Sequence, residues 1–287
     1  MQPRHMIAPE AKTRTGKTAA KDQGQPRTRG GIILSAKRRG PDSVIDGLRQ
    51  VGAYKALFPR GRGMLQSILI NTSGGVTGGD QLALTAEVGS GAALGLTTQA
   101  AERAYRSREG DFGHVTSAIK VAEGATLHWL PQEVILYDGC ALSRRLDIDL
   151  AADARLLLVE PVVFGRAAMG ECLTSGRFHD RITVTRGGRP LYRDALHLEG
   201  AISDQLALRP VADGMGAMAS LVYVAPDAET RLTTIRSQLP ATCGASLLAP
   251  DLLALRLLCP DSHMLRKHLI PILDLLSGDT LPVSWRL

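Results

Sequence analysis

The residues with the clearest chemical potential lie in one glycine-rich stretch between Asn71 and Leu82, which reads N-T-S-G-G-V-T-G-G-D-Q-L. Its only carboxylate is Asp80, and its four glycines are Gly74, Gly75, Gly78 and Gly79. Glycine inside a regular element costs roughly 0.5–1 kcal/mol relative to alanine, so this backbone is expected to adopt positive φ or to pass close to another group. Such a loop could hold a phosphate, present a carboxylate to a metal ion, or form only a tight turn.

The glycine stretch lacks the other parts of a phosphate-binding loop. No lysine follows its last glycine, and the next segment, Leu82–Val88, alternates like a strand and does not open a helix. Phosphate loops and dinucleotide-binding loops both use the N–H groups of a helix N-terminus. A second candidate, Gly16-Lys17-Thr18, also fails, because Ala11 occupies the position of the first P-loop glycine. The sequence therefore predicts no nucleotide site.

Histidines, cysteines and serines give no catalytic pattern. The seven histidines form no H-E-x-x-H motif, so each is interpreted as a surface or interior residue and not as a zinc ligand. They are His5, His114, His128, His179, His197, His263 and His268. The four cysteines are far apart and form no C-x-x-C pair, which argues against a structural zinc site and a disulfide framework. No G-x-S-x-G nucleophile motif occurs.

Carboxylates beside apolar segments leave a glycosidase-like alternative open. Trp129–Glu133 and Tyr137-Asp138-Gly139 each place an acid next to an apolar run, and paired carboxylates can hydrolyse glycosides. Nothing in the sequence fixes such a pair, and aromatic residues, which form sugar platforms, make up only 4% of the chain. The residues alone indicate a binding or scaffold protein, with a β-solenoid hydrolase or carbohydrate-binding protein as the alternative.

The basic charge of the chain is concentrated at its N-terminus. Residues 1–30 hold seven basic and two acidic residues, so they account for most of the net charge of +6. This polar segment is predicted to be a disordered basic tail. The remaining chain is close to neutral and offers no basic face for nucleic acid. No apolar run reaches the ~18 residues of a membrane span, and no secretory signal is apparent, so we expect a cytoplasmic protein without a membrane partner.

Short apolar runs separated by Gly, Pro and Asp predict a mainly β domain over residues 31–287. The predicted strands are Ile32–Ala36, Leu65–Asn71, Gln81–Val88, Ala93–Thr98, Val115–Val121, Thr126–Trp129, Val134–Tyr137, Ser143–Leu150, Leu156–Phe164 and Arg181–Thr185. A weak repeat of a small turn pair, any residue and leucine begins at Gly91, Gly124 and Asp153. The alanines shared by the repeats are 33 and 29 residues apart. Repeats of this size favour a β-helix-like stack of strands over a plain sandwich.

Residues 220–287 change to a β-α-β-β-α order. Asp227 is predicted to cap a first helix, and Asp261 or the next residue to cap a second helix that ends at Gly278. Pro271 is expected to kink or shorten the second helix. The domain is therefore predicted to be a stacked β body with two C-terminal α-helices.

Six motifs in order resemble the pattern of the urease accessory protein UreD (UreH) family. They are Gly74–Asp80, Thr97 to Ser107, Leu127–Glu133, Gly165 to Glu171, Gly244–Leu248 and Pro282–Trp285, and together they span about residues 30–287. The resemblance implies a β-helix-like fold with two C-terminal helices. It also implies a cytoplasmic, non-enzymatic chaperone of nickel insertion and metallocentre assembly in nitrogen metabolism.

The resemblance further implies partners and a route for the metal. Similar proteins bind the urease apoprotein and UreF, and through UreF the GTPase UreG, with a dimeric accessory complex as one option. Nickel is cargo in transit through an internal tunnel, and no tightly bound cofactor is expected. The family associates two acidic positions with that tunnel, which correspond to Asp80 and Asp194, and the four glycines would then be structural. Glu133 and Glu171 are either part of the path or structural carboxylates, and the C-terminal helices and Trp285 are candidate contacts for the UreF-like partner.

Overall fold

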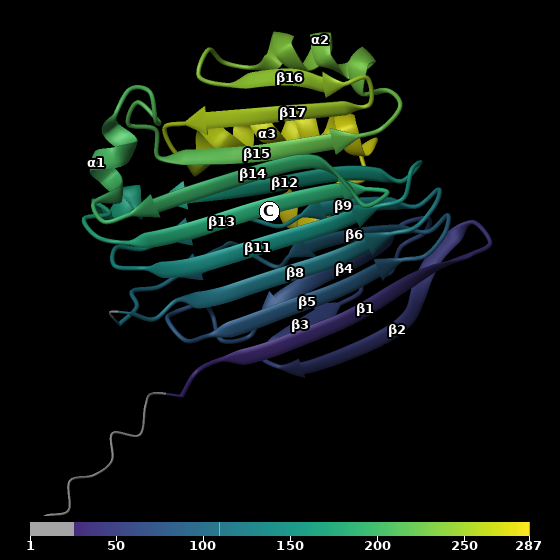
Figure 1. The fold of residues 1–287 in the computed structure, drawn as a ribbon, viewed down its shortest axis with the longest axis horizontal. Coiled ribbons are helices and arrows are strands. Elements are labelled where there is room, and N and C mark those ends of the chain that lie inside the picture. Colours follow the sequence, from purple (N-terminus) through teal and green to yellow (C-terminus); the bar gives the residue numbers. More distant parts are fainter. Residues whose placement is uncertain (1–25, 109, 287) are drawn as a thin grey trace, which may run out of the picture.

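The computed structural model describes residues 26–108 and 110–286 and places them in two facing β-sheets, with the C-terminal helices packed against one of the two sheets (Figure 1). Strands make up 51% of the described residues, which confirms the predicted mainly β class. The seven-stranded sheet has the order β14 (Arg189–Glu199), β13 (Arg177–Arg186), β11 (Ala141–Leu150), β8 (Gly113–Val121), β5 (Gln81–Val88), β1 (Arg29–Arg39) and β2 (Asp42–Gly52).

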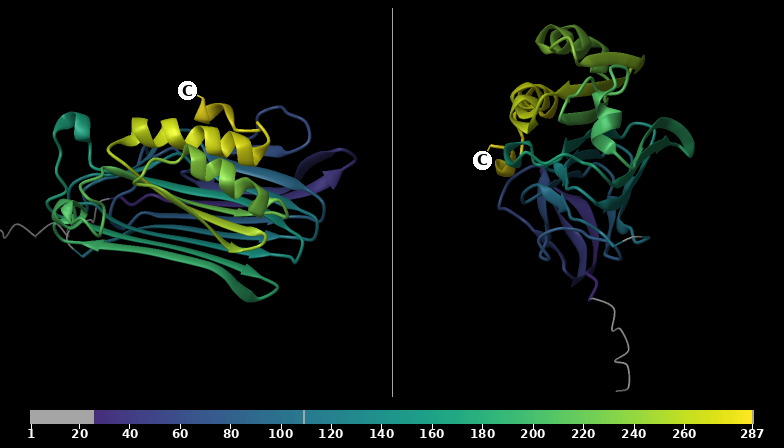
Figure 2. Two further views of the ribbon diagram at one scale, coloured as in Figure 1. Left: turned by 90° about the horizontal axis from the view of Figure 1, so that it is seen from above. Right: turned by 90° about the vertical axis from the view of Figure 1, so that its left-hand side faces the viewer.

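The second sheet has ten strands. Eight form the main order β16 (Gly244–Ala249), β17 (Leu252–Cys259), β15 (Ala217–Val224), β12 (Arg155–Phe164), β9 (Thr126–Leu130), β6 (Ala93–Thr98), β4 (Leu65–Asn71) and β3 (Tyr54–Leu57). The short strands β10 (Val134–Leu136) and β7 (Glu102–Ala104) pair with each other, and β10 also pairs with β12. The chain alternates between the sheets, so successive strands of each sheet stack in parallel as turns of a solenoid (Figure 2).

The predicted repeat corresponds to the turns of this stack. Leu94 pairs with Leu127, and Leu127 pairs with Leu156, all in parallel register. The two spacings between the repeats are therefore the lengths of two solenoid turns. The sequence prediction of stacked β layers is confirmed.

The core between the two sheets follows from strict alternation along the strands. In β5, Leu82, Leu84, Ala86 and Val88 are buried, while the residues between them are exposed. Burying each large aliphatic side chain contributes about 1.5–3 kcal/mol. A second apolar cluster joins the outer face of the ten-stranded sheet to the C-terminal helices, and Trp285 is fully buried in it.

Three α-helices are present in the described residues: α1 (Ile202–Ala207), α2 (Ala228–Gln238) and α3 (Ser262–Ser277). The short helix α1 was not predicted. Asp261 caps α3 as expected, because its carboxylate accepts a hydrogen bond from the N–H of Met264, and α3 continues through Pro271 without ending there. The side chain of Asp227 does not cap α2 and instead accepts hydrogen bonds from Tyr223 and Arg231. Two short 3₁₀ helices occur at Ala167–Met169 and Val283–Trp285.

The N-terminal boundary differs from the prediction. Strand β1 begins at Arg29, before the expected domain start at Gly31. Most of the predicted disordered tail, residues 1–25, lies outside the described residues. Within the described part of the chain, no helix has the length and apolar character needed to cross a membrane.

Candidate functional site

The glycine stretch forms a corner of the solenoid between β4 and β5. Gly74 and Gly79 have φ values of 80° and 84°, in the left-handed region that favours glycine. Gly75 and Gly78 have ordinary φ but no room for a side chain, because an added Cβ would lie 2.8 Å from the Arg103 carbonyl oxygen and 2.9 Å from the Asp111 carbonyl oxygen, respectively. Two glycines therefore allow the turn, and two allow close approach of neighbouring turns.

Asp80 ends this corner and is almost fully buried, with 4% exposure. Its Oδ1 accepts a hydrogen bond from the N–H of Thr28 at 2.7 Å, and its Oδ2 accepts one from the N–H of Thr77 at 2.9 Å. Thr28 lies just before β1, so the carboxylate ties the start of the domain to the glycine corner. Backbone donors thus engage both oxygens of Asp80.

Charged residues occupy the inward faces of both sheets in the middle of the stack. Arg144 of β11 forms ion pairs with Glu160 of β12, at 2.7 Å, and with Asp180 of β13. Glu160 also accepts a hydrogen bond from the Trp129 indole N–H at 2.6 Å. Burial raises the pKa of Glu160 above its usual range, and the positive charge of Arg144 opposes this shift.

A pocket of about 70 Å³ lies between the sheets beside this charged cluster. Its lining includes Glu102 of β7 and Tyr54 of β3 in addition to Arg144, Glu160 and Asp180. Burial raises the pKa of Glu102, so its carboxyl group holds a proton more readily than an exposed one. Burial also raises the pKa of Tyr54, and the charges of Glu102 and Glu160 add to that shift.

Asp194 extends the charged cluster toward the edge of the stack. It lies on β14, where it accepts a hydrogen bond from the Ser220 hydroxyl at 2.9 Å and pairs with Arg256 at 2.7 Å. Glu160, Ser220 and Arg256 occupy neighbouring register positions on β12, β15 and β17. Side-chain exposure rises from 7% at Glu160 to 18% at Asp194 and 42% at Arg256. Arg144, Glu160, Asp180, Asp194 and Arg256, here called the inner charged row, therefore lead from the interior toward the surface.

The two carboxylates that the sequence placed on one path have different surroundings in the structure. Asp194 belongs to the inner charged row, and neither Asp194 nor Asp80 is among the residues that line the inter-sheet pocket. The charge of Asp80 nevertheless helps to raise the pKa of Glu102, which does line that pocket. Local sequence does not predict the cluster of Arg144, Glu160 and Asp180, because these residues come from different turns of the solenoid. A charged residue inside an otherwise apolar strand, such as Glu160 in L-L-L-V-E-P-V-V-F, was the available signal.

Glu133 and Glu171 have structural partners. Glu133 pairs with Arg266 of α3 at 3.2 Å, and the same guanidinium donates a hydrogen bond to the backbone oxygen of Trp285 at 2.9 Å. Glu171 pairs with Arg166 at 2.8 Å and closes a loop. Trp285 is fully buried and donates its indole N–H to the Leu130 carbonyl. The Trp285 side chain is therefore buried against its own chain, and a contact of this region with a partner protein stays a prediction.

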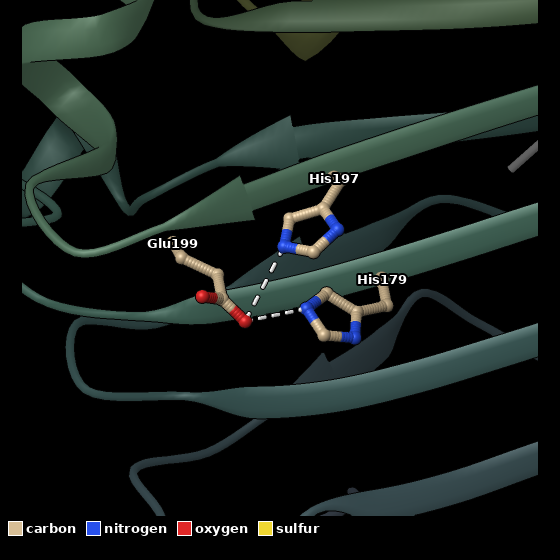
Figure 3. A group of neighbouring side chains, drawn as sticks. All are labelled: His179, His197 and Glu199. Atoms are coloured by element: carbon tan, nitrogen blue, oxygen red, sulfur yellow. Dashed lines mark hydrogen bonds and ion pairs between the residues drawn. The ribbon is translucent and has the colours of Figure 1, made fainter.

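Two histidines and a glutamate, not selected from the sequence, meet on the outer face of the seven-stranded sheet (Figure 3). His179 of β13 lies directly opposite His197 of β14, and Glu199 lies two residues further along β14. The Glu199 carboxylate is 2.7 Å from His179 Nε2 and 3.3 Å from His197 Nε2. The signal in the sequence was the H-x-E pattern of β14, which places both side chains on one face of a strand.

Comparisons with known proteins agree over nearly the whole chain. The family model described as UreD urease accessory protein matches residues 28–285. A protein of Roseobacter denitrificans named urease accessory protein UreD is 49% identical over 92% of this chain and 96% of its own length. Proteins with the same name from Ruegeria pomeroyi and a Methylobacterium species are 50% and 41% identical, over 88% and 91% of this chain and 98% and 95% of their own lengths.

Proposed function

The chain belongs to the UreD urease accessory protein family, and we propose that it matures urease as a scaffold that guides nickel into the apoprotein. In this proposal it binds apo-urease and a UreF–UreG complex in the cytoplasm and catalyses no reaction itself. Nickel is its cargo and not a resident cofactor. The proposal extends the family assignment, which supports a role in urease maturation, to the partners and the metal route.

The inner charged row is the observation that carries the nickel route. A buried ion-pair cluster rarely stabilises a protein more than well-packed apolar residues would, because both charges lose their hydration. Arg144, Glu160 and Asp180 therefore contribute little that a leucine core could not supply. Carboxylate oxygens that are already paired with arginine can exchange partners with a divalent cation and release it again, which suits transport better than a Cys/His cage.

Asp194 and Asp80 receive different roles in this proposal. Asp194, at the partly open end of the inner charged row, offers a carboxylate that a passing ion can reach. Asp80, which backbone N–H groups hold on both oxygens, supports the route indirectly by anchoring the glycine corner.

A gene deletion tests the role in urease maturation, and a point variant tests the nickel route. Deleting the gene in a urease-positive strain should abolish urease activity while the urease subunits are still made. Urease purified from the deletion strain complemented with the Asp194→Asn variant should contain less nickel than urease from the strain complemented with the wild-type gene. Asparagine keeps an acceptor for Ser220 and Arg256 but removes the negative charge. Co-purification with UreF should be unchanged.

Glu87→Gln is the matched control, because Glu87 is an exposed carboxylate on the outer face of β5. Full urease activity in the deletion strain would refute the maturation role. Normal nickel content with Asp194→Asn, at equal protein levels, would refute the assigned route but leave the maturation role intact.

A further inference from the structure

We propose that His179, His197 and Glu199 form an open binding site for one divalent transition-metal ion on the outer face of the seven-stranded sheet. Their ligand atoms all lie within 4.8 Å of one another (Figure 3). Side chains on this face point away from the inner charged row, since the neighbouring residues Phe178 and Leu198 are buried between the sheets. The site is therefore separate from the inter-sheet pocket.

The separations between Glu199 and the two histidines fit a single ion. Nitrogen and oxygen ligands bind such ions at about 2.1 Å, which puts two ligand atoms roughly 3.0 Å apart at 90° and roughly 3.4 Å apart at a tetrahedral angle. The observed Oε1–Nε2 separations, 2.7 Å for Glu199 with His179 and 3.3 Å for Glu199 with His197, lie close to these values. The ligand atoms of the two histidines lie within 4.8 Å of each other, so side-chain rotation must bring all three atoms onto one ion.

The β13–β14 hairpin holds the ligands in place. A bulge between Val184 and Thr185 shifts the pairing by one residue and sets His179 opposite His197; with the register of Thr185 and Pro190 continued, His179 would face Leu196 instead. The two imidazole rings are in contact, with their centroids 4.0 Å apart and their planes inclined at 40°. The bulge is therefore the feature that creates the site.

Residues next to the three ligands contact His179 and the backbone of Glu199. Phe112 packs against His179 with a ring separation of 4.9 Å, and Gln205 of α1 donates a hydrogen bond to the Glu199 carbonyl. Arg177, the cross-strand neighbour of Glu199, places its guanidinium over the Phe112 ring at 4.4 Å. The guanidinium is therefore held over Phe112 and not paired with the Glu199 carboxylate.

The donor set selects the class of ion. Two imidazoles and one carboxylate suit Ni²⁺, Zn²⁺ and Cu²⁺ and not Mg²⁺ or Ca²⁺, which prefer oxygen ligands. The side chains of His179, Glu199 and His197 are 34%, 50% and 66% exposed, so water can complete the coordination and the ion can exchange. The site itself does not depend on the proposed function; only the choice of Ni²⁺ as its natural ion rests on that proposal.

Isothermal titration of the tag-free full chain with NiCl₂, and separately with ZnCl₂, tests the site. Mutating a residue that only hydrogen-bonds to a metal ligand lowers metal affinity by about 10–100-fold. Removing a ligand itself should therefore lower the affinity by at least as much. The double variant His179→Ala/His197→Ala should therefore lose one metal equivalent, and Glu199→Gln should weaken the same equivalent at least about tenfold. In wild-type protein loaded with Co²⁺, the visible spectrum should show imidazole ligation that the double variant lacks.

His114→Ala is the matched control. His114 shares the lateral row of His179 on the same sheet, with Ser143 of β11 between them, but it is outside the cluster. The control should bind metal like the wild type, and circular dichroism should show that all variants are folded. Wild-type protein that binds neither ion, or a double variant that keeps every equivalent, would overturn the inference. Because the assay uses the purified chain alone, its failure is distinguishable from failure of the urease maturation role.

Discussion

Replacing Asp80 with alanine removes the acceptor of two backbone N–H groups, those of Thr28 and Thr77. Hydrogen bonds to a charged group contribute about 1.5–3 kcal/mol each, and the two donors would remain in a region where Asp80 is only 4% exposed. We expect Asp80→Ala to lower the free energy of unfolding by roughly 3–6 kcal/mol. That is a large share of the about 5–15 kcal/mol typical of a folded domain. Urea unfolding followed by circular dichroism measures it.

Two further variants sharpen this test. Asp80→Asn keeps one acceptor oxygen and should lose about half as much stability. Asp111→Ala removes a carboxylate near the same corner that is 51% exposed and 3.6 Å from Arg27, and it should change stability by less than about 1 kcal/mol. If Asp80→Ala unfolds within about 1 kcal/mol of the wild type, the carboxylate does not anchor the corner. A loss of nickel delivery by that stable variant would then place Asp80 on the metal route.

Three other substitutions probe the interior. Arg144→Met should cost about 3–5 kcal/mol in urea unfolding because it leaves two buried carboxylates, Glu160 and Asp180, without their positively charged partner, whereas the exposed Arg145→Met should cost much less. His128 is buried, which lowers its pKa to about 4, so the unfolded chain binds a proton near pH 6.5 that the folded chain does not. Stability should therefore fall between pH 6.5 and 4, and His128→Leu should remove up to about 3 kcal/mol of that fall, seen in unfolding curves at several pH values. Gly75→Ala should lower the melting temperature through overpacking of roughly 1–3 kcal/mol, while Gly61→Ala, which meets no atom within 4 Å, should not.

Local sequence was sufficient to predict the bounds of strands that form apolar runs between turn residues. The predicted bounds of β4, β5 and β6 agree with the structure, because turn residues flank each run; β5 alternates strictly between buried and exposed residues, whereas β6 is a short, continuously apolar run that is buried on both faces. Strand β2 was not predicted, since its side chains are mostly exposed on both faces and give no alternation. The repeat was visible because stacked turns place leucines at equivalent positions.

The candidate sites depend on partners that local sequence does not reveal. Asp194 meets Arg256 across 62 residues, and Asp80 meets Thr28 across 52. The histidine pair depends on a single bulge, and a slip of one residue moves every side chain of a strand to the opposite face. Residue types and motifs could nominate Asp80 and Asp194, but only the three-dimensional structure separates an anchoring carboxylate from one in the inner charged row.

The outermost strands of the two sheets also determine how the molecule can associate. Strands β2, β14 and β16 each pair with an antiparallel neighbour through a register shift, and β3 is only four residues long. Bulged and very short edges are poor templates for strand addition, which protects a stacked β protein from growing into fibrils. These edges therefore disfavour end-to-end growth of the stack, and we expect partners to dock on its faces and helices.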